Sequence, residues 1–499
     1  MARSTLDKDL KKVVRIEAAT QSMSRSLAVP GLLAVFLLAT VAVASLSITE
    51  GPLNAFVILA AVVAAYMALN IGANDVANNM GPAVGSRALT LAGALVIATI
   101  CEAAGAILAG GDVTTTLARD IVQPDAMSKL SFILVMITTL LAAAMWVHLA
   151  TILGAPVSTT HAVVGAVVGA GAAAAGVSAV SWSVVGVITA SWVMSPVLGG
   201  LMAAMLLGFV KAAVLFRTDR VAAARRWVPV LFGLMIGIFA MYMAHKGLAR
   251  VWSVPAGLML PIGAVFFVLG TAVAWFWVDK RARTMENRRK HVASLFKLPL
   301  IMAAALLSFA HGANDVANAV GPLAAIVHAA QSDVVSTGAL HLPFWVLAIG
   351  AVGLSLGLAL FGPRLIRTVG EKITKMDPIR AWCVALSAAT TVLIASALGL
   401  PVSSTHIAVG AVFGVGFLRE YLTNKGVPNP AVQPRSLFLE PSRLNRTPEQ
   451  ALANFQKRER RRLVRRQHVF GIAAAWIVTV PASGSLAALI YLVLSSAAG

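Results

Sequence analysis

The sequence predicts an all-α polytopic membrane protein with about 10–12 spans, built from a duplicated repeat whose helices are broken or re-entrant. An inverted arrangement of the two copies is expected, because it is the common one among transporters. Three observations lead to this fold class. Hydrophobic residues make up 59% of the 499 positions and charged residues only 12%, where soluble domains carry about a quarter. The mean hydropathy is +0.84. Two short polar motifs each occur twice, in the same order along the chain.

Apolar runs of about 20 residues, the length that crosses a bilayer core, recur along the whole chain. They lie at roughly 28–48, 53–73, 88–110, 130–155, 182–210, 228–247, 256–278, 298–313, 343–362, 379–400 and 468–496. Two further runs, 156–176 and 401–418, follow another run with only Pro156 or Pro401 between them. Each such pair is predicted to be a helix, a break and a second helix, which a membrane tolerates only inside protein or beside water.

The predicted organisation places the motifs in two membrane repeats separated by connecting spans. Its parts are a basic cytoplasmic tail (1–27), a first membrane repeat (28–210), connecting spans with a basic cytoplasmic loop (211–297), a second membrane repeat (298–420), a polar basic cytoplasmic loop (421–467) and a final span (468–499). The relative orientation of the repeats does not follow from the sequence, but an inverted pair is the common transporter arrangement.

The formal net charge of +20 comes from basic residues concentrated in loops and at chain ends. This is the distribution that the positive-inside rule expects, so no nucleic-acid partner is needed. The tail lacks the apolar segment of a signal peptide. We therefore expect a multi-pass protein of the cell inner membrane, with the tail and the basic loops in the cytoplasm. Cys101 and Cys383 show no metal-ligand spacing.

The first repeated motif, GANDVAN, occupies residues 72–78 and 312–318, and each copy continues with two residues and Gly-Pro. On a helix, the two asparagines of each copy lie four residues apart on one face, with the aspartate beside them. A carboxylate at membrane depth costs at least about 2.5–3.5 kcal/mol, so it indicates a cation, a proton or a paired charge. The flanking glycines and prolines are expected to let the helix open and free carbonyl groups. Polar contacts between helices are the structural alternative.

The predicted ligands of the cation are carboxylate and amide oxygens, which suit Na⁺, Mg²⁺ or Ca²⁺ and suit Zn²⁺ poorly. They are Asp75, Asn78, Asp315 and Asn318.

The second motif reads PVSTTH at 156–161 and PVSSTH at 401–406. Proline and Ser or Thr favour a helix start, and a helix N-terminus offers free N–H groups and a positive dipole end to an anion. The hydroxyls of Ser158, Thr159, Thr160, Ser403, Ser404 and Thr405 add donors. An ordinary capped helix is the alternative. The roles of His161 and His406 stay open: either could orient a hydroxyl, relay a proton or pack.

The two repeats are not equivalent at three positions. Glu102 lies inside a span and corresponds to Leu354 in the second repeat, and an intramembrane carboxylate is a functional candidate by default. His311 replaces Ile71, and Ala319 replaces Asn79. We expect any functional difference between the two repeats to arise at these positions.

Over nearly all of the chain outside 1–27 and 421–467, these motifs resemble the inorganic phosphate transporter (PiT) family of phosphate permeases. The carrying segments are GANDVANNMGPAVGSRALT (72–90), PVSTTHAVVGAVVG (156–169), HGANDVANAVGP (311–322), GLPVSSTHIAVGAVFGVG (399–416) and the final span WIVTVPASGSLAALI (476–490). The resemblance implies an inverted-repeat fold with re-entrant helices and phosphate at the repeat interface. Eukaryotic members carry a glutamate at Glu102 and a second one at the position of Ala385.

The resemblance also implies the site residues. Phosphate ligands would be Asn74, Asp75, Ser158, Thr159, Thr160, Asn314, Asp315, Ser403, Ser404 and Thr405, and the coupling cation would use Asp75, Asn78, Asp315, Asn318 and Glu102. The absence of the second glutamate leaves the coupling ion open between Na⁺ and H⁺.

The predicted function is secondary active symport of inorganic phosphate with Na⁺ or H⁺, without a cofactor and without enzymatic activity. The expected partners are phosphate, the cation and the lipid bilayer, and the oligomeric state is open, a homodimer being one alternative. Sulfate, or a metal–phosphate complex, is the alternative substrate on the same fold. An intramembrane metal-dependent hydrolase and a structural or receptor protein are the rivals from other classes; the first lacks an H-E-x-x-H motif.

Overall fold

The computed structural model describes residues 28–49, 51–153, 157–247, 254–331, 342–372, 376–424 and 466–498. Within these ranges the chain is almost entirely helical, and 11 helices are long and apolar enough to cross a membrane. The protein is thus a multi-pass membrane protein of the predicted class. The tail 1–27 and most of the loop 421–467 lie outside the described residues.

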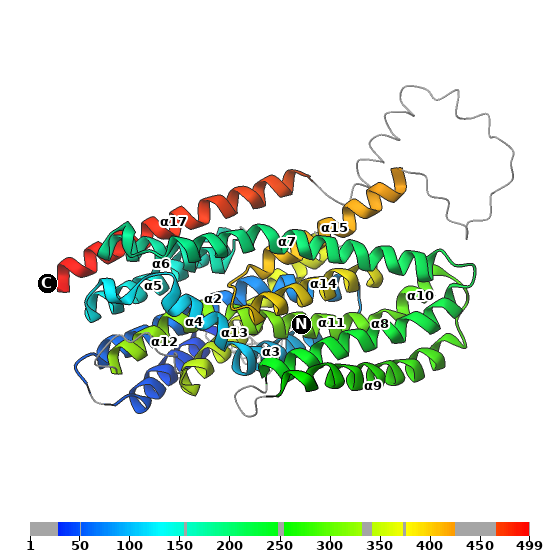
Figure 1. Ribbon diagram of the computed structural model, residues 1–499, viewed down its shortest axis with the longest axis horizontal. Helices are drawn as coiled ribbons and strands as arrows, with labels where there is room; N and C mark the ends of the chain where they lie inside the picture. The colour runs from blue at the N-terminus through cyan, green and yellow to red at the C-terminus, as the bar shows by residue number, and fades with distance from the viewer. Residues whose placement is uncertain are drawn as a thin grey trace, which may run out of the picture.

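Figure 1 shows the order of the helices along the chain. They are Ala28–Ser47, α2 Asn54–Gly85, α3 Leu91–Ala109, α4 Gly111–Thr115, α5 Lys129–Leu153, α6 Thr159–Ala175, α7 Trp182–Val210, α8 Arg220–Tyr242, α9 Ala256–Ala282, α10 Arg289–Leu295, α11 Lys297–Asp315, α12 Ala317–Gln331, α13 Phe344–Lys372, α14 Pro378–Ala397, α15 Ser404–Asn424 and α17 Arg466–Ala498. π-Helical turns follow α4, α7 and α8 at Thr116–Asp120, Lys211–Leu215 and Met243–Gly247.

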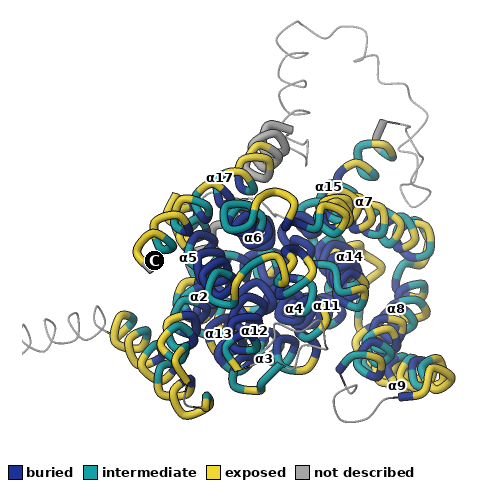
Figure 2. Tube along the Cα trace, turned by 60° about the vertical axis from the view of Figure 1, so that its left-hand side comes forward, coloured by how far each residue is buried: buried dark blue, intermediate teal, exposed yellow. Residues whose placement is uncertain are grey.

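Burial is concentrated in a central group of helices (Figure 2). The spans containing α11 with α12, α14, α5 and α2 are the most buried, whereas α9 and the helix Ala28–Ser47 are the least. The outer helices expose large apolar side chains, among them Leu198, Val268 and Leu489. Apolar surface of this extent is costly in water but suits lipid.

The two predicted breaks occur at the PVS(T/S)TH motifs. Helix α5 ends at Leu153 before α6 begins at Thr159, and α14 ends at Ala397 before α15 begins at Ser404. The described residues just before the second helix, 157–158 in the first copy and 401–403 in the second, are non-helical and buried. The structure therefore confirms the sequence of helix, break and helix.

The second GANDVAN copy shows only a small irregularity and not the expected opening. Helix α11 ends at Asp315 and α12 begins at Ala317, but the backbone of Val316 between them keeps helical torsions (φ −57°, ψ −32°). In the first copy the expectation is wrong, because α2 runs without a break from Asn54 to Gly85. The two copies also differ in their contacts. In the second copy the Asn314 side chain hydrogen-bonds backbone groups of the α14–α15 connection.

The repeats exchange helices with one another. Helix α2 packs on α13 while its counterpart α11 packs on α3, and α6 packs on α17 while its counterpart α15 packs on α7. Glycines make these contacts close. A Cβ on Gly72, Gly312, Gly165 or Gly410 would overlap or press on the backbone of Leu354, Glu102, Val480 or Pro196, respectively. The exchange brings both copies of both motifs to the middle of the molecule.

Candidate functional site

The four motif segments meet in one buried cluster. All of the predicted ligands except Asn74 and Asn78 expose 4% or less of their surface, and those two are half-buried. The cluster lies where α2, the α11–α12 junction and the starts of α6 and α15 come together. The sequence-based selection therefore describes one contiguous site.

Within each repeat, matching side chains make matching hydrogen bonds. Asn74 Nδ2 donates to Thr151 Oγ1 at 3.0 Å, and Asn314 Nδ2 donates to Ser396 Oγ at 2.9 Å. These bonds tie each GANDVAN segment to the end of the helix before its partner motif. The aspartates are held in the same way. Their hydrogen bonds come from Thr159 Oγ1 to Asp75 Oδ2 (3.3 Å) and from Ser404 Oγ to Asp315 Oδ2 (3.2 Å).

A second matched pair of hydrogen bonds connects the two repeats. Asn78 Nδ2 of the first repeat donates to Thr405 Oγ1 of the second at 2.7 Å. Asn318 Nδ2 of the second repeat donates to Thr160 Oγ1 of the first at 3.2 Å. Each GANDVAN helix thereby contacts the helix start of the other repeat, so the site exists only where both repeats are present.

The hydrogen bonds between the repeats are not equivalent at the two aspartates. Thr405 Oγ1 lies 3.0 Å from Asp75 Oδ1, so Asp75 is held by hydroxyls from both repeats. The matching hydroxyl, Thr160, instead donates to the backbone oxygen of Val402 at 3.1 Å. Asp315 receives a different neighbour, His311, whose Nε2 lies 3.1 Å from Asp315 Oδ2.

Ser158 and Ser403 act as N-caps of α6 and α15. The backbone N–H of His161 donates to Ser158 Oγ (3.2 Å), and that of His406 donates to Ser403 Oγ (3.3 Å). Capping of this kind satisfies one of the free N–H groups of a helix start. These two hydroxyls therefore shape the helix starts, while the hydroxyls that follow them in the chain face the carboxylates and amides.

The two histidines of the PVS(T/S)TH motifs contact each other at the junction of the repeats. Their ring centroids lie 4.5 Å apart, and Trp192 of α7 stacks on His161 at 3.7 Å. Trp192 Nε1 also donates to the backbone oxygen of Pro401 at 3.0 Å. His161 Nδ1 lies 2.6 Å from Ser158 Oγ. These contacts place both histidines as packing and orienting groups for the helix starts.

The three positions at which the repeats differ meet in one place. His311 Nδ1 and Asn79 Nδ2 approach the same oxygen, Glu102 Oε1, at 3.1 and 2.9 Å. His311 Nε2 faces Asp315 and lies 3.8 Å from Asp75 Oδ2. All of these side chains are at most 1% exposed. One imidazole therefore links three buried carboxylates.

The three positions that correspond to His311, Asn79 and Glu102 in the opposite repeats are apolar. They hold Ile71, Ala319 and Leu354, all fully buried in one hydrophobic cluster. The site consequently has one polar side, built on His311 and Glu102, and one side sealed by hydrocarbon.

Several buried oxygens of the polar side have no hydrogen-bond donor among the described residues. They are Asp315 Oδ1, Asn318 Oδ1, Asn79 Oδ1 and Glu102 Oε2. A buried acceptor without a partner costs about 1–3 kcal/mol. Oxygen ligands of this kind fit a hard cation, and one ligand atom each from Asp75, His311 and Asp315 lie within 4.8 Å of one another.

Three site residues escaped the sequence analysis: Thr151, Ser396 and Trp192. Thr151 and Ser396 stand at the same distance before the serine of their own PVS(T/S)TH motif. Extending the repeat comparison upstream of Pro156 and Pro401 would have found them. No repeated motif in the sequence points to Trp192, because α7 lies against the starts of α6 and α15 only in the folded protein.

Comparison with known proteins identifies the family. Residues 71–487 match the model of the phosphate transporter family. A Helicobacter pylori protein, named provisionally as a phosphate permease, is 41% identical over 97% of this chain and 98% of its own length. The chloroplastic inorganic phosphate transporter 2-1 of Arabidopsis thaliana is 37% identical over 71% of this chain and 64% of its own.

A solved structure has the same fold. It is titled the sodium-dependent phosphate transporter, and it aligns with a TM-score of 0.75 and 33% identity over 89% of this chain and 99% of its own. Because the relatives are carriers, the alternative of an intramembrane hydrolase is excluded. With its paired GANDVAN and PVS(T/S)TH segments joined in a single buried site, this chain belongs to the phosphate transporter family.

Proposed function

We propose that this protein takes up inorganic phosphate across the cell inner membrane by symport with a cation, Na⁺ or H⁺. The proposal rests on the hydrogen bonds that join side chains of the two repeats around Asp75 and Asp315. Hydroxyl donors, helix starts and carboxylates from both halves come together in one buried cluster. Such a midplane site between repeats is where transporters of this architecture bind their substrate.

The phosphate would bind at the starts of α6 and α15. Both helices direct free backbone N–H groups and a positive dipole end to the site. The hydroxyls of Thr159, Thr160, Ser404 and Thr405 are the nearby side-chain donors. No lysine or arginine is among the site residues, so the anion is held by dipoles and by the co-bound cation and can be released again.

The cation would bind at Asp75 and Asp315 with the amide oxygens of Asn78 and Asn318. Asp315 Oδ1 and Asn318 Oδ1 have no donor among the described residues, which supports a cation at the second motif. Glu102, held by Asn79 and His311, lies on this side of the site as well. The proton alternative would use the same carboxylates, with His311 between them.

The hydrogen bonds suggest how cation and anion are coupled. Three of the hydroxyls, those of Thr159, Ser404 and Thr405, donate to the carboxylates. A hydroxyl donor can turn to another acceptor by rotation about its C–O bond. A cation on the carboxylates would take over the stabilisation of their charge, and the hydroxyls could then donate to phosphate. Loading of either ion thus favours loading of the other, and the loaded halves rock to alternate access.

The decisive experiment measures uptake of labelled phosphate into proteoliposomes with a Na⁺ gradient and a proton gradient imposed separately. We expect one gradient to drive accumulation and the other to have little effect, which assigns the coupling ion. Equal uptake without either gradient would exclude symport.

A second arm of the same assay tests the substrate. Sulfate binds to the same kinds of donor, but at neutral pH phosphate alone retains a proton that Asp75 or Asp315 can accept. We therefore expect unlabelled phosphate to displace the labelled substrate and an equal concentration of sulfate to displace little of it. Stronger competition by sulfate would assign sulfate as the substrate.

A further inference from the structure

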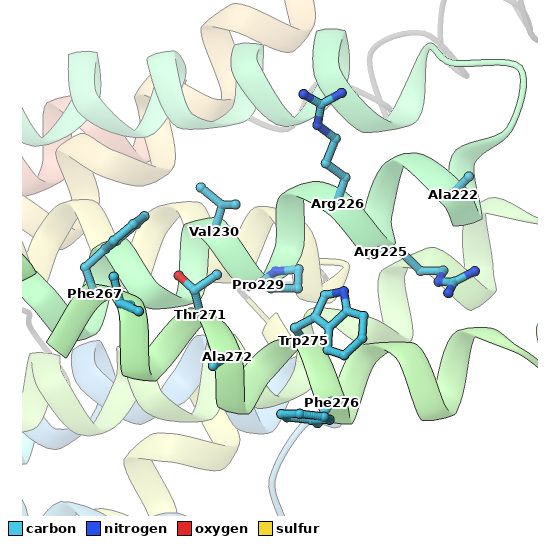
Figure 3. A pocket seen from close by; sticks show the side chains of 11 residues that line it. Ala222, Arg225, Arg226, Pro229, Val230, Phe267, Thr271, Ala272, Trp275 and Phe276 are labelled. Carbon is cyan, nitrogen blue, oxygen red and sulfur yellow. The ribbon is translucent and has the colours of Figure 1, made fainter. Parts of the chain in front are cut away.

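A groove lies on the outer side of the helix pair α8–α9, away from the central site (Figure 3). Its volume is about 770 Å³. The lining residues are Ala222, Arg225, Arg226, Pro229, Val230, Phe267, Val268, Thr271, Ala272, Trp275 and Phe276. Both helices are candidate membrane spans, and α9 is the least buried of all the spans, so the groove faces the lipid region.

The walls of the groove are mostly hydrocarbon. Phe267 and Val230 lie at one end, and Pro229 faces Trp275 farther along (Figure 3). The helix pair is tightly joined: a Cβ on Gly233 would overlap the Thr271 side chain and press on the backbone of Phe267. The groove is therefore part of a well-packed pair rather than a gap between loosely associated helices.

The other end of the groove carries positive charge. Arg225 and Arg226 of α8 lie there, and their side chains point in different directions, that of Arg226 away from Trp275 (Figure 3). Asp279 is the carboxylate partner of Arg225, but it also pairs with Arg283 at 2.7 Å, so one acid serves two guanidinium groups. Among the described residues Arg226 has no ion pair, and its guanidinium lies 5.7 Å from the Trp227 ring centroid.

A second, more polar pocket of about 420 Å³ adjoins this end. It shares Ala222 and Arg225 with the groove and adds Thr218, Asp219, Val221, Met285 and Asn287. The Asp219 carboxylate caps α8 by accepting from the backbone N–H of Ala222. The surface thus changes from apolar to cationic to polar over a short distance along the helix pair. This order matches a phospholipid, with an acyl chain, a phosphate and a polar head group.

We propose that the α8–α9 groove binds one anionic phospholipid. An acyl chain lies between Pro229 and Trp275, the phosphate contacts Arg225 and Arg226, and the head group reaches the polar pocket. Free phosphate does not fit this surface as well, because most of the lining offers no hydrogen-bond donor. Tryptophan beside the arginines is the residue that membrane interfaces favour, and basic clusters next to spans attract anionic lipids.

The test uses native mass spectrometry of the full chain after equilibration with phosphatidylglycerol or with phosphatidylcholine of the same acyl chains. We expect the wild type to retain a single phosphatidylglycerol in preference to phosphatidylcholine. Arg225→Gln/Arg226→Gln should lower this retention by about tenfold, which corresponds to about 1.4 kcal/mol. Ala272→Trp, which fills the apolar wall and keeps both arginines, should lower retention of both lipids.

Two matched controls separate the groove from general surface effects. Arg288→Gln removes the same charge from a side chain that is 75% exposed and outside the groove. Val273→Trp adds the same bulk to the neighbouring position on α9, which is 64% exposed and does not line the groove. Both should behave as the wild type.

Three results would overturn the proposal. They are equal retention of the two lipids by the wild type, unchanged retention in the double arginine variant, and loss of lipid in the controls to the same extent. A change from dimer to monomer in Ala272→Trp, with lipid retention unaltered, would assign the groove to a second copy of this chain instead.

Discussion

At the scale of single residues, the site is organised by two aspartates in different surroundings. Asp75 accepts hydrogen bonds from a hydroxyl of each repeat. Asp315 has one hydroxyl and one imidazole nitrogen beside it and an oxygen without a donor among the described residues. The two carboxylates occupy matching positions in the sequence repeat but have different surroundings, so under the proposed function they would hold a cation differently.

Replacing either aspartate by asparagine tests the cation role. Asp75→Asn and Asp315→Asn keep the shape of the side chain and remove the charge that a cation must neutralise. We expect cation-driven phosphate uptake in proteoliposomes to fall by at least about tenfold in each, because a loss of only 1.4 kcal/mol has that effect. Asp125→Asn, an exposed acid far from the site in sequence, is the control. Near-normal coupled uptake by either site variant would refute the assignment.

The unequal trio of His311, Glu102 and Asn79 permits a stability test. His311→Ile alone removes the imidazole from three buried carboxylates and should destabilise the protein by about 3 kcal/mol, as breaking a buried pair does. Adding Glu102→Leu and Asn79→Ala installs the apolar set that already packs in the other half. Thermal unfolding in detergent should therefore show the triple variant to be more stable than the single variant. The opposite order would mean that the two halves do not pack alike.

At this scale the sequence predicted much of the site. The duplication identified the carboxylates, amides and hydroxyls, and comparison of the copies singled out His311, Asn79 and Glu102, which the structure joins in one cluster. It did not predict that Asn78 would bond Thr405 and Asn318 would bond Thr160. Residue order alone does not say which repeat supplies a partner, because a bond within one repeat would leave the same pattern.

At the scale of elements, close helix contacts position the motifs. Helix α11 approaches the backbone of α3 at Gly312, and α2 approaches α13 at Gly72. We infer that α17 is the counterpart of α7, because α17 contacts α6 as α7 contacts α15. The sequence concealed this relation, since the long segment 425–465 separates α15 from α17. It also suggested an opened helix in both GANDVAN copies, whereas α2 is continuous and the second copy departs from regular helix only at Val316.

Gly312→Ala tests the close contact between α11 and α3. A Cβ there would overlap the backbone of Glu102, which cannot move as a flexible side chain would. We expect a loss of about 1–3 kcal/mol in stability, as overpacking typically costs, together with reduced uptake because His311 is displaced from Glu102. Gly186→Ala in α7 adds the same group where the space is open and should be neutral or stabilising. Equal behaviour of both variants in thermal unfolding would contradict the contact.

The start of α14 gives a pH-dependent prediction outside the membrane-spanning segments. Asp377 caps the helix by accepting from Arg380 N (3.0 Å) and pairs with the Arg289 and Arg380 side chains. Burial alone would raise the pKa of Asp377, but these arginines hold it below its usual range. The stabilisation is therefore present above an unfolded pKa of about 3.9 and is lost as the pH falls through the lower folded value.

Asp377→Asn should consequently destabilise the protein by about 1 kcal/mol at neutral pH, mainly through the lost ion pairs, since asparagine retains the cap. The difference from the wild type should shrink as the medium is acidified. Chemical denaturation at a series of pH values measures it, and a difference that stays constant down to the acid range would show that charge is not the cause.

At the scale of the whole molecule, the exchanged pairing of helices makes the two repeats one unit around a central site (Figure 1). The structure confirms the all-helical membrane class and the duplicated motifs. The inversion of the repeats and the cytoplasmic position of the basic loops stay predictions, because helix packing does not reveal which side of the membrane a loop faces.

Labelling from the two sides of the membrane tests these predictions together. Lys290 lies in the basic loop region, close to the start of α14 through the Arg289–Asp377 pair. Asp125 lies before α5, which corresponds to α14 in the first repeat. If the repeats are inverted, a membrane-impermeant maleimide should reach Lys290→Cys only from the cytoplasmic side and Asp125→Cys only from the opposite side, in a background without Cys101 and Cys383. Labelling of both from one side would show parallel repeats.

The reciprocal pairing of helices also constrains how such a protein can arise. If each half were a separate, identical chain, two copies would have to interlock to build the site, and every residue would appear twice. The positions of His311 and Ile71 would then have to carry the same residue. Two identical copies therefore could not build a cluster that is polar on one side and apolar on the other, whereas halves with different sequences can.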